Sequence, residues 1–229
     1  MPQHSTALIV GANRGIGLGV VREYLSRGVS VIATARNPDA AAELRALAQA
    51  NPGRVDIRAL DMNDGAQIDA FAATLPEIDV ALVNAGVSGP DHRTANKASA
   101  AEIGALMFVN AIAPTRLARH LMPKLRAGGV LAFTSSVMGS VALNPGGHEL
   151  YRASKAALNS LTRGLHPELR GRGIALLTMH PGWVRTDMGG PTAAVSVEDS
   201  ALGMVDTIAS AAGSDDHRFL DWKGDTIAW

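Results

Sequence analysis

The feature that most constrains the fold is a regular alternation of short apolar runs with longer helical segments. Seven runs rich in apolar and β-branched residues predict strands, at 7–10, 29–34, 55–60, 80–83, 130–134, 174–179 and 218–220. The intervening segments have helical periodicity, at 16–27, 40–50, 66–75, 101–126, 151–170 and 197–212. Continuous apolar strands separated by helices are typical of parallel sheets that are covered on both faces. We therefore expect a doubly wound α/β fold with a mostly parallel, seven-stranded sheet.

The amino-acid composition limits which kinds of binding partner a protein with such a fold can have. The 229-residue chain carries 21 lysine and arginine residues against 21 aspartate and glutamate residues, so no net field attracts nucleic acid or an anionic membrane. No apolar run reaches the ~18 residues of a membrane span, and no cysteine is present for a disulfide or a thiolate metal site. Because no linker or repeat divides the chain, we expect one cytoplasmic domain, 1–229, that acts on a small molecule and binds neither nucleic acid nor membrane.

Histidine and carboxylate residues lie close together at three places. These are His148-Glu149, His166-Pro167-Glu168 and Asp215-Asp216-His217. None of them has a second cluster at the spacing that a metal site requires. The sequence therefore predicts no bound metal.

A glycine-rich turn follows the first predicted strand and leads into the first helix. Its sequence is Gly11-Ala12-Asn13-Arg14-Gly15-Ile16-Gly17. Glycines at such a turn let the backbone approach a pyrophosphate, whose charge is met by free N–H groups at the helix N-terminus. The turn therefore predicts the dinucleotide site of a Rossmann-type sheet.

Two arginines near this turn favour one dinucleotide over the other. The second predicted strand leads into Arg36, at the place where an NAD enzyme usually presents an acidic residue to the ribose 2′-hydroxyl. Arg14, inside the glycine turn, would reach the same place, and two guanidinium groups would bind a 2′-phosphate. We expect NADP(H) rather than NAD(H). The alternative is that both arginines are solvated surface charges.

One of the two tyrosines lies four residues before a lysine. On a helix, Tyr151 and Lys155 would share one face. A phenol with the ordinary pKa of about 10 is a poor acid–base catalyst at neutral pH, and an ammonium group at ~4–5 Å would lower that pKa by ~2–3 units. We therefore expect Tyr151 to be the catalytic acid–base group. Tyr24 has no such neighbour and is expected to pack in the core.

Further motifs follow in order along the chain. They are Asp61-Met62, Asn84-Ala85-Gly86, Asn110, Ser136-x-x-Gly139, Pro181-Gly182 with Thr186, and a short tail that ends in Trp229. With the glycine turn and the Tyr-x-x-x-Lys pair, they make the chain resemble the short-chain dehydrogenase/reductases over essentially its whole length. The resemblance is to their single-domain branch, and within it to the C-factor and sniffer-type carbonyl reductases.

The resemblance implies a role for each motif. Tyr151 would exchange a proton with the substrate oxygen while a hydride passes to or from nicotinamide. Lys155 would also hold the nicotinamide ribose, Ser136 would hydrogen-bond the substrate oxygen, and Asn110 would hold a water that links Lys155 to solvent. Alternatively, Asn110 accommodates a helix kink near Pro114. The cofactor would contact Gly11, Asn13, Arg14, Gly15, Ile16, Gly17, Arg36, Asp61, Met62, Asn84, Ala85, Gly86, Tyr151, Lys155, Pro181, Gly182, Val184 and Thr186.

A largely apolar pocket is expected beside this site. Its walls would be Ser88, Met138, Leu143, His148, Trp183 and Met188. Such walls favour a ketone, aldehyde or quinone with hydrophobic bulk. The loop 181–195 would close over substrate and cofactor. One departure from the family is Val10, where a threonine is usual, so a hydroxyl contact between strands is expected to be missing.

We therefore expect an oxidoreductase that transfers a hydride between NADP(H) and a carbonyl/alcohol pair, above all a carbonyl reductase. An alternative is an NADP(H)-binding signalling or regulatory protein of the C-factor type with little turnover. A nucleotide-sugar epimerase or dehydratase would need a substantial substrate domain after Pro181, where only about fifty residues follow. The sequence leaves open whether the protein is a monomer or a homo-oligomer.

Overall fold

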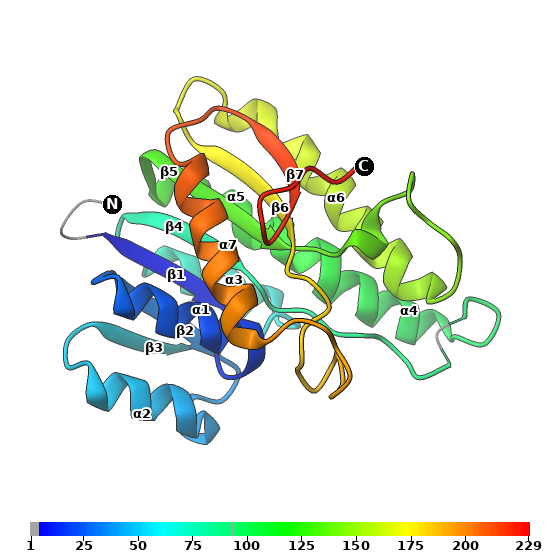
Figure 1. The fold of residues 1–229 in the computed structure, drawn as a ribbon, viewed down its shortest axis with the longest axis horizontal. Helices are drawn as coiled ribbons and strands as arrows, with labels where there is room; N and C mark the ends of the chain where they lie inside the picture. Colours follow the sequence, from blue (N-terminus) through cyan, green and yellow to red (C-terminus); the bar gives the residue numbers. More distant parts are fainter. Residues whose placement is uncertain (1–4, 93) are drawn as a thin grey trace.

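The computed structural model describes residues 5–92 and 94–229, which form one parallel sheet between two layers of helices (Figure 1). The strand order is β3-β2-β1-β4-β5-β6-β7, and neighbouring strands pair in parallel. The strands are β1 Thr6–Val10, β2 Ser30–Ala35, β3 Val55–Ala59, β4 Ile78–Val83, β5 Leu125–Thr134, β6 Ala175–His180 and β7 His217–Asp221. Along the chain, the strands are added outward from β1 to β3, and the chain then returns to add β4 on the other side of β1. Sheets of this kind bind ligands at the point between β1 and β4 where the strand order reverses. The predicted doubly wound α/β fold is confirmed.

The helices divide between the two faces of the sheet. One face is covered by α1 (Gly15–Ser26), α2 (Ala42–Ala50) and α7 (Val197–Ala211), as Figure 1 shows. The other face is covered by α3 (Gly65–Ala73), α5 (Ala113–Leu121) and α6 (Glu149–Leu169), and α4 (Ala100–Met107) packs against α6. No helix among the described residues has the length and apolar character needed to cross a bilayer.

The apolar strands are buried on both faces, which explains why their sequences do not alternate. In β1, Ala7 and Ile9 face the core shared with α1 and α7, while Leu8 and Val10 face the core shared with α3 and α5. All four residues are fully buried. The central strand therefore lies at the middle of the molecule and fixes the glycine turn that follows it.

The prediction of one helix over 101–126 is wrong. The structure has α4, then a π-helical turn at Phe108–Ile112, then α5 and a 3₁₀ turn at Met122–Lys124, and β5 already begins at Leu125. The apolar periodicity hid these changes because the π turn keeps both flanking helices in register with the core. Such turns are frequent at functional sites, and this one carries Asn110.

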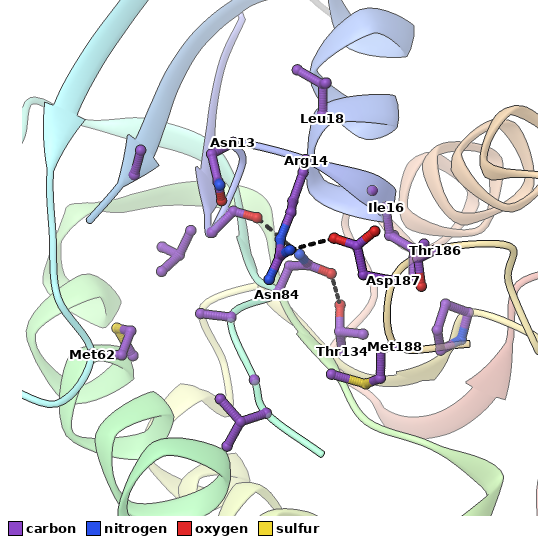
Figure 2. Close-up of a pocket in the computed structure, with 18 of the residues that line it drawn as sticks. Asn13, Arg14, Ile16, Leu18, Met62, Asn84, Thr134, Thr186, Asp187 and Met188 are labelled. Atoms are coloured by element: carbon purple, nitrogen blue, oxygen red, sulfur yellow. Dashed lines mark hydrogen bonds and ion pairs between the residues drawn. The ribbon is translucent and has the colours of Figure 1, made fainter. Parts of the chain in front are cut away.

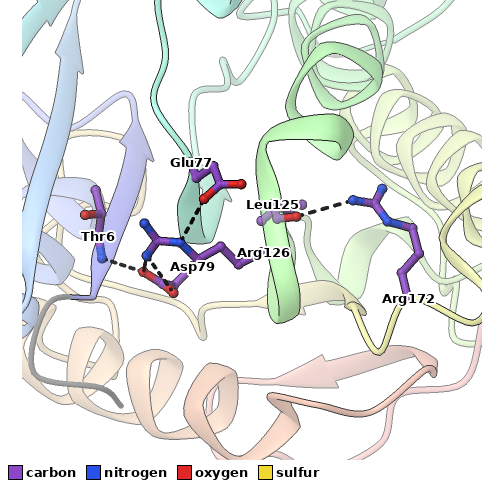
Figure 3. Close-up of polar contacts among 6 residues, drawn as sticks. All are labelled: Thr6, Glu77, Asp79, Leu125, Arg126 and Arg172. Carbon is purple, nitrogen blue, oxygen red and sulfur yellow. Dashed lines mark hydrogen bonds and ion pairs between the residues drawn. The ribbon is translucent and has the colours of Figure 1, made fainter.

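The amino ends of the central strands are joined by charged side chains (Figure 3). The Asp79 carboxylate accepts a hydrogen bond from the Thr6 backbone N–H at 2.7 Å and pairs with Arg126 at 3.0 Å. Arg126 also pairs with Glu77, at 3.4 Å. These contacts bind β1, β4 and β5 together at the edge of the sheet opposite the glycine turn.

Candidate active site

A cleft of about 680 Å³ opens at the carboxyl ends of the strands (Figure 2). Its walls include most of the predicted cofactor residues, namely Gly11, Asn13, Arg14, Gly15, Ile16, Arg36, Asp61, Met62, Asn84, Ala85, Gly86, Tyr151, Lys155, Pro181 and Thr186. Of the predicted substrate residues, Met188 lines it. The remaining predicted residues are not among those that line the cleft: Gly17, Asn110, Ser136, Gly182, Val184, Ser88, Met138, Leu143, His148 and Trp183.

The glycine turn leaves no room for side chains. Gly11 has a φ of +81°, and a Cβ there would lie 2.9 Å from the Cα of Ala85. A Cβ on Gly17 would lie 2.1 Å from the carbonyl oxygen of Gly11. The turn thus holds bare backbone at the start of α1, which is the arrangement that suits a pyrophosphate.

A chain of hydrogen bonds across four strands fixes the turn. The Gly11 N–H donates to the Thr34 hydroxyl at 3.0 Å, and the Asn84 amide donates to the Gly11 carbonyl at 3.0 Å. The Thr134 hydroxyl in turn donates to the Asn84 side-chain oxygen at 3.0 Å. The hydroxyl contact expected to be missing because of Val10 is therefore supplied by neighbouring strands. Sequence reasoning missed Thr34 and Thr134, although both are hydroxyl residues at or near the carboxyl end of an apolar strand.

The two predicted phosphate-binding arginines both lie at the cleft. Arg36 is exposed just after β2, and Arg14 directly precedes α1. Figure 2 shows the Arg14 guanidinium turned toward Asp187, with which it forms an ion pair. Sequence reasoning missed this carboxylate contact, because Asp187 is 173 residues away from Arg14 in the chain.

Tyr151 and Lys155 share one face of α6, as predicted. The Lys155 Nζ lies 5.8 Å from the centroid of the Tyr151 ring and donates to the Thr134 carbonyl at 2.9 Å. The lysine side chain is almost fully buried, and burial lowers its pKa to about 8. The ammonium is therefore held at the wall of the cleft, at the end of β5.

The expectation that Lys155 lowers the pKa of Tyr151 is wrong for this structure. Burial raises the pKa of the Tyr151 phenol to about 12, and a hydrogen bond with Ser136 offsets only part of that effect. Desolvation wins because the neutral phenol is favoured wherever water is excluded. Tyr151 is therefore protonated at neutral pH, which is the state that a proton donor needs.

Adjacent serines after β5 have different partners. The Ser135 hydroxyl donates to the side chain of Asn159 at 2.6 Å and is thereby committed to α6. Ser136 accepts from the Met138 N–H at 3.1 Å and is the serine bonded to Tyr151. This geometry favours Ser136, the serine identified from the motif, as the partner of a substrate oxygen.

Asn110 lies fully buried in the π-helical turn. Its side-chain oxygen accepts from the Val87 N–H, and its amide donates to the Val87 carbonyl, both at 2.8 Å. The amide also donates to the Ser154 hydroxyl on α6 at 3.0 Å. A Cβ on Gly86 would lie 3.3 Å from the Asn110 oxygen and 3.4 Å from the Lys155 Nζ. Asn110 thus joins the helix irregularity to the segment after β4, beside the lysine.

The predicted substrate-pocket residues lie on exposed loops. Trp183, Met188 and Leu143 are 56%, 54% and 52% exposed. Ser88 and His148 are also exposed, whereas Met138 is half-buried in a 3₁₀ turn. Met188 lines the cleft, whereas the other five residues are not among its lining residues.

The loop 181–195 is held together by its own hydrogen bonds. The Val195 N–H donates to the Trp183 carbonyl at 2.9 Å, and the Trp183 indole donates to the Gly189 carbonyl at 2.8 Å. The Arg185 guanidinium donates to the carbonyl of Ala193 at 3.0 Å. These contacts join the two arms of the loop to each other.

Metal-binding side chains do not gather in the described residues. Within 5–92 and 94–229, histidine and carboxylate groups form no cluster of three or more suited to an ion. The cleft instead offers bare backbone, guanidinium groups and a Tyr–Lys pair.

A parallel sheet with a glycine cradle and a buried tyrosine–lysine pair defines a dinucleotide-dependent oxidoreductase. The family model described as short chain dehydrogenase matches residues 5–197. The chain therefore belongs to the short-chain dehydrogenase/reductase family, and the resemblance in its motifs is confirmed.

Known proteins similar to this chain fall into the expected subgroup. C-signal of Myxococcus xanthus is 39% identical over 155 residues, covering 66% of this chain and 93% of the relative. A carbonyl reductase of Pseudomonas aeruginosa PAO1 in complex with NADP is 43% identical, with a TM-score of 0.92 over 99% of this chain and 100% of that one. The carbonyl reductase Sniffer of D. melanogaster is 30% identical, with a TM-score of 0.89 over 99% and 100% of the two chains.

Proposed function

We propose that this chain is a single-domain carbonyl reductase that uses NADPH. The observation that carries the proposal is that Tyr151 and Lys155 line the same cleft as the glycine turn, with Ser136 hydrogen-bonded to Tyr151. The turn suits a dinucleotide, and the tyrosine suits a small oxygen-bearing substrate. The similarity to a carbonyl reductase in complex with NADP supports both the proposed cofactor and the proposed reaction.

The residues present fit NADP(H). The turn would receive the pyrophosphate, because a Cβ on Gly17 would fill the space against Gly11. Arg14 and Arg36 would receive the 2′-phosphate, and Asp61 with Met62 would face the adenine. Several similar proteins of known structure hold NADP or NADPH, which supports the same cofactor here. When bound, NADPH supplies the hydride that reduces a carbonyl carbon.

The chain's own residues would handle the oxygen and its proton. Ser136 and Tyr151 would hydrogen-bond the carbonyl oxygen, and Tyr151 would give that oxygen the proton that makes it a hydroxyl. Lys155, held by the Thr134 carbonyl, would stabilise the phenolate left behind. Burial keeps Tyr151 protonated at neutral pH, so the phenol carries the proton that reduction of a carbonyl requires.

Exposed apolar side chains in the segments after β5 and β6 support a proposal for the substrate class. Trp183, Met188 and Leu143 present hydrophobic surface and no charge toward solvent. An apolar ketone, aldehyde or quinone would cover part of that surface when bound. We propose such a carbonyl compound as the substrate.

Similarity to C-signal favours a second candidate function, an NADP(H)-binding signalling protein with little turnover. The two functions differ in what they require of Tyr151. A binding protein has no use for a buried phenol bonded to Ser136, whereas a reductase depends on it.

The test is NADPH oxidation by the unaltered protein, Tyr151→Phe and Tyr24→Phe, over a panel of ketones, aldehydes and quinones. Tyr24 is the matched control because its hydroxyl is fully buried and has no hydrogen-bond partner among the described residues. Tyr151→Phe should lose about 10²–10⁴-fold in kcat while still binding NADPH, and Tyr24→Phe should keep full activity. Equal activity of Tyr151→Phe, or no turnover by the unaltered protein, would overturn the proposal.

A further inference from the structure

The segment after β7 folds back along that strand toward α6. Leu220 and Thr226 form an antiparallel bridge, and the Ile227 N–H donates to the Phe219 carbonyl at 2.9 Å. Ile227 is 8% exposed and is thereby fixed against the sheet. The chain therefore reaches Trp229 in a defined position beside α6 (Figure 1).

The Trp229 ring has neighbours on two elements. Its centroid lies 5.3 Å from the ring of Phe219 and 4.8 Å from the ring of His217, both on β7. The Arg163 guanidinium of α6 lies 5.4 Å from the Trp229 ring, at cation–π distance. These contacts clamp one side chain between the edge strand and the helix that carries Tyr151.

The backbone of Trp229 contacts a different part of the chain from the one its ring contacts. Its carbonyl accepts a hydrogen bond of 3.0 Å from the N–H of Ala142. Ala142 belongs to the loop 140–148, which joins the turn after Ser136 to the start of α6. The loop therefore connects, along the chain, the two catalytic residues that would contact a substrate oxygen, Ser136 and Tyr151.

The loop has little packing of its own. Val141 and Leu143 are 74% and 52% exposed, and its other contacts are largely short-range, such as Leu143 N–H to Ser140 hydroxyl at 3.1 Å. At its far end the Arg152 guanidinium donates to the Gly147 carbonyl at 2.8 Å. A segment with few buried apolar contacts opens at low free energy, so its position depends on anchors from outside.

We propose that Trp229 is a positioning residue that fixes the loop 140–148, which connects Ser136 to Tyr151, and so determines which carbonyl compounds are accepted. The inference rests on the proposed reductase function. Bulky apolar substrates, which need Leu143 and its neighbours as a wall, depend on the anchor. Small carbonyl compounds, which contact only Ser136 and Tyr151, do not.

The experiment measures NADPH-dependent kinetics with phenanthrenequinone as the bulky probe and diacetyl as the small one. Trp229→Ala should raise KM for phenanthrenequinone about tenfold, because aromatic and cation–π contacts of this kind shift an equilibrium by about that factor. The KM for diacetyl, the kcat for both probes and the Kd of NADPH should stay within about twofold. Trp229→Phe should restore most of the KM, since it keeps the ring.

Arg163→Met provides a second variant at the surface of α6, where loss of folding is not expected. It should raise the KM for phenanthrenequinone about threefold. Lys223→Met is its matched control, because the Lys223 Nζ lies 5.1 Å from the ring of Trp222 in the same segment as Trp229 but on a different ring. The control should leave both KM values unchanged.

Hydrogen exchange tests the anchor directly. The Ala142 amide should be protected in the unaltered protein and exchange about tenfold faster in Trp229→Ala, with the amide of Ile227 less affected. Turnover with unchanged KM for phenanthrenequinone in both Trp229→Ala and Arg163→Met would overturn this inference alone. A parallel loss of NADPH binding in Trp229→Ala, with no effect of Arg163→Met, would overturn it in favour of a general folding role. Absence of turnover by the unaltered protein would overturn the proposed function first.

Discussion

Arg14 and Asp187 form an ion pair across the mouth of the cleft, one from the glycine turn and the other from the loop 181–195 (Figure 2). Their side chains are 66% and 74% exposed, so the pair is weak and easily exchanged for a stronger partner. A 2′-phosphate is such a partner, because it brings more charge to the same guanidinium. In the proposed NADPH complex, the carboxylate would therefore compete with the 2′-phosphate for Arg14.

Removing the competing charge should tighten NADPH binding. We predict that Asp187→Asn lowers the Kd of NADPH about two- to fivefold and leaves the Kd of NADH unchanged. Asp206→Asn is the control, since Asp206 pairs with Arg27 at 2.8 Å away from the cleft. Fluorescence titration gives both constants. An equal effect on NADH would mean that Asp187 acts on the loop rather than on Arg14.

The choice of dinucleotide should follow the two arginines. A charged bidentate contact contributes roughly 1.5–3 kcal/mol, so we predict at least a tenfold preference for NADPH over NADH. Arg36→Asp should reverse it, because it adds repulsion and offers the NAD ribose an acceptor. Arg14→Ala should weaken it without a reversal. The measurement is the ratio of kcat/KM for the two cofactors, and a parent that prefers NADH contradicts the assignment.

The buried ammonium of Lys155 should make stability depend on pH. Its pKa is 10.5 in an unfolded chain and about 8 here, so between these values the unfolded state binds more protons. Lys155 should therefore contribute a rise of about 3 kcal/mol in the free energy of unfolding between pH 8 and 10.5, offset near pH 10 by Tyr24 and Tyr151, whose pKa values burial raises. Lys155→Met should lose that rise. Urea unfolding at neutral pH and near the upper end of the window gives both slopes, and parallel slopes would show that Lys155 keeps its ordinary pKa.

The glycine turn should tolerate no methyl group. We predict that Gly17→Ala weakens NADPH binding by more than about a hundredfold and destabilises the fold by about 1–3 kcal/mol, because its Cβ would lie 2.1 Å from the Gly11 carbonyl oxygen. Gly164→Ala is the matched helical control, since a Cβ there meets nothing within 4 Å. It should raise stability by about 0.5–1 kcal/mol and leave NADPH binding unchanged. Calorimetry measures the effect of each variant on stability, and cofactor titration measures its effect on NADPH binding.

Local features of the sequence were enough to predict the sheet and much of the site. Apolar runs separated by helical segments predicted the parallel strands, because strands buried on both faces cannot alternate. The face shared by Tyr151 and Lys155 follows from helix geometry alone. The place of the glycine turn follows from its position between β1 and α1.

Irregular segments escaped prediction. The π turn around Asn110 and the early start of β5 at Leu125 leave the apolar pattern almost unchanged. Their positions depend on contacts with distant residues, such as the bonds from Asn110 to Val87. A periodic pattern records which side chains are buried but not how the backbone turns between them.

The sequence by itself therefore determined the fold class, the family and the residue types of the site, because each of these follows from the spacing of residues along a strand, a turn or a helix. Only the tertiary structure decided which partners those residues have. It brought the Lys155 ammonium into hydrogen-bond contact with the Thr134 carbonyl and the Trp229 carbonyl into contact with the Ala142 N–H. It formed the ion pair between Asp187 and Arg14. It also raised the pKa of Tyr151 instead of lowering it. These outcomes depend on the packing of residues far apart in the chain and on the exclusion of water around them, and neither is encoded in local spacing.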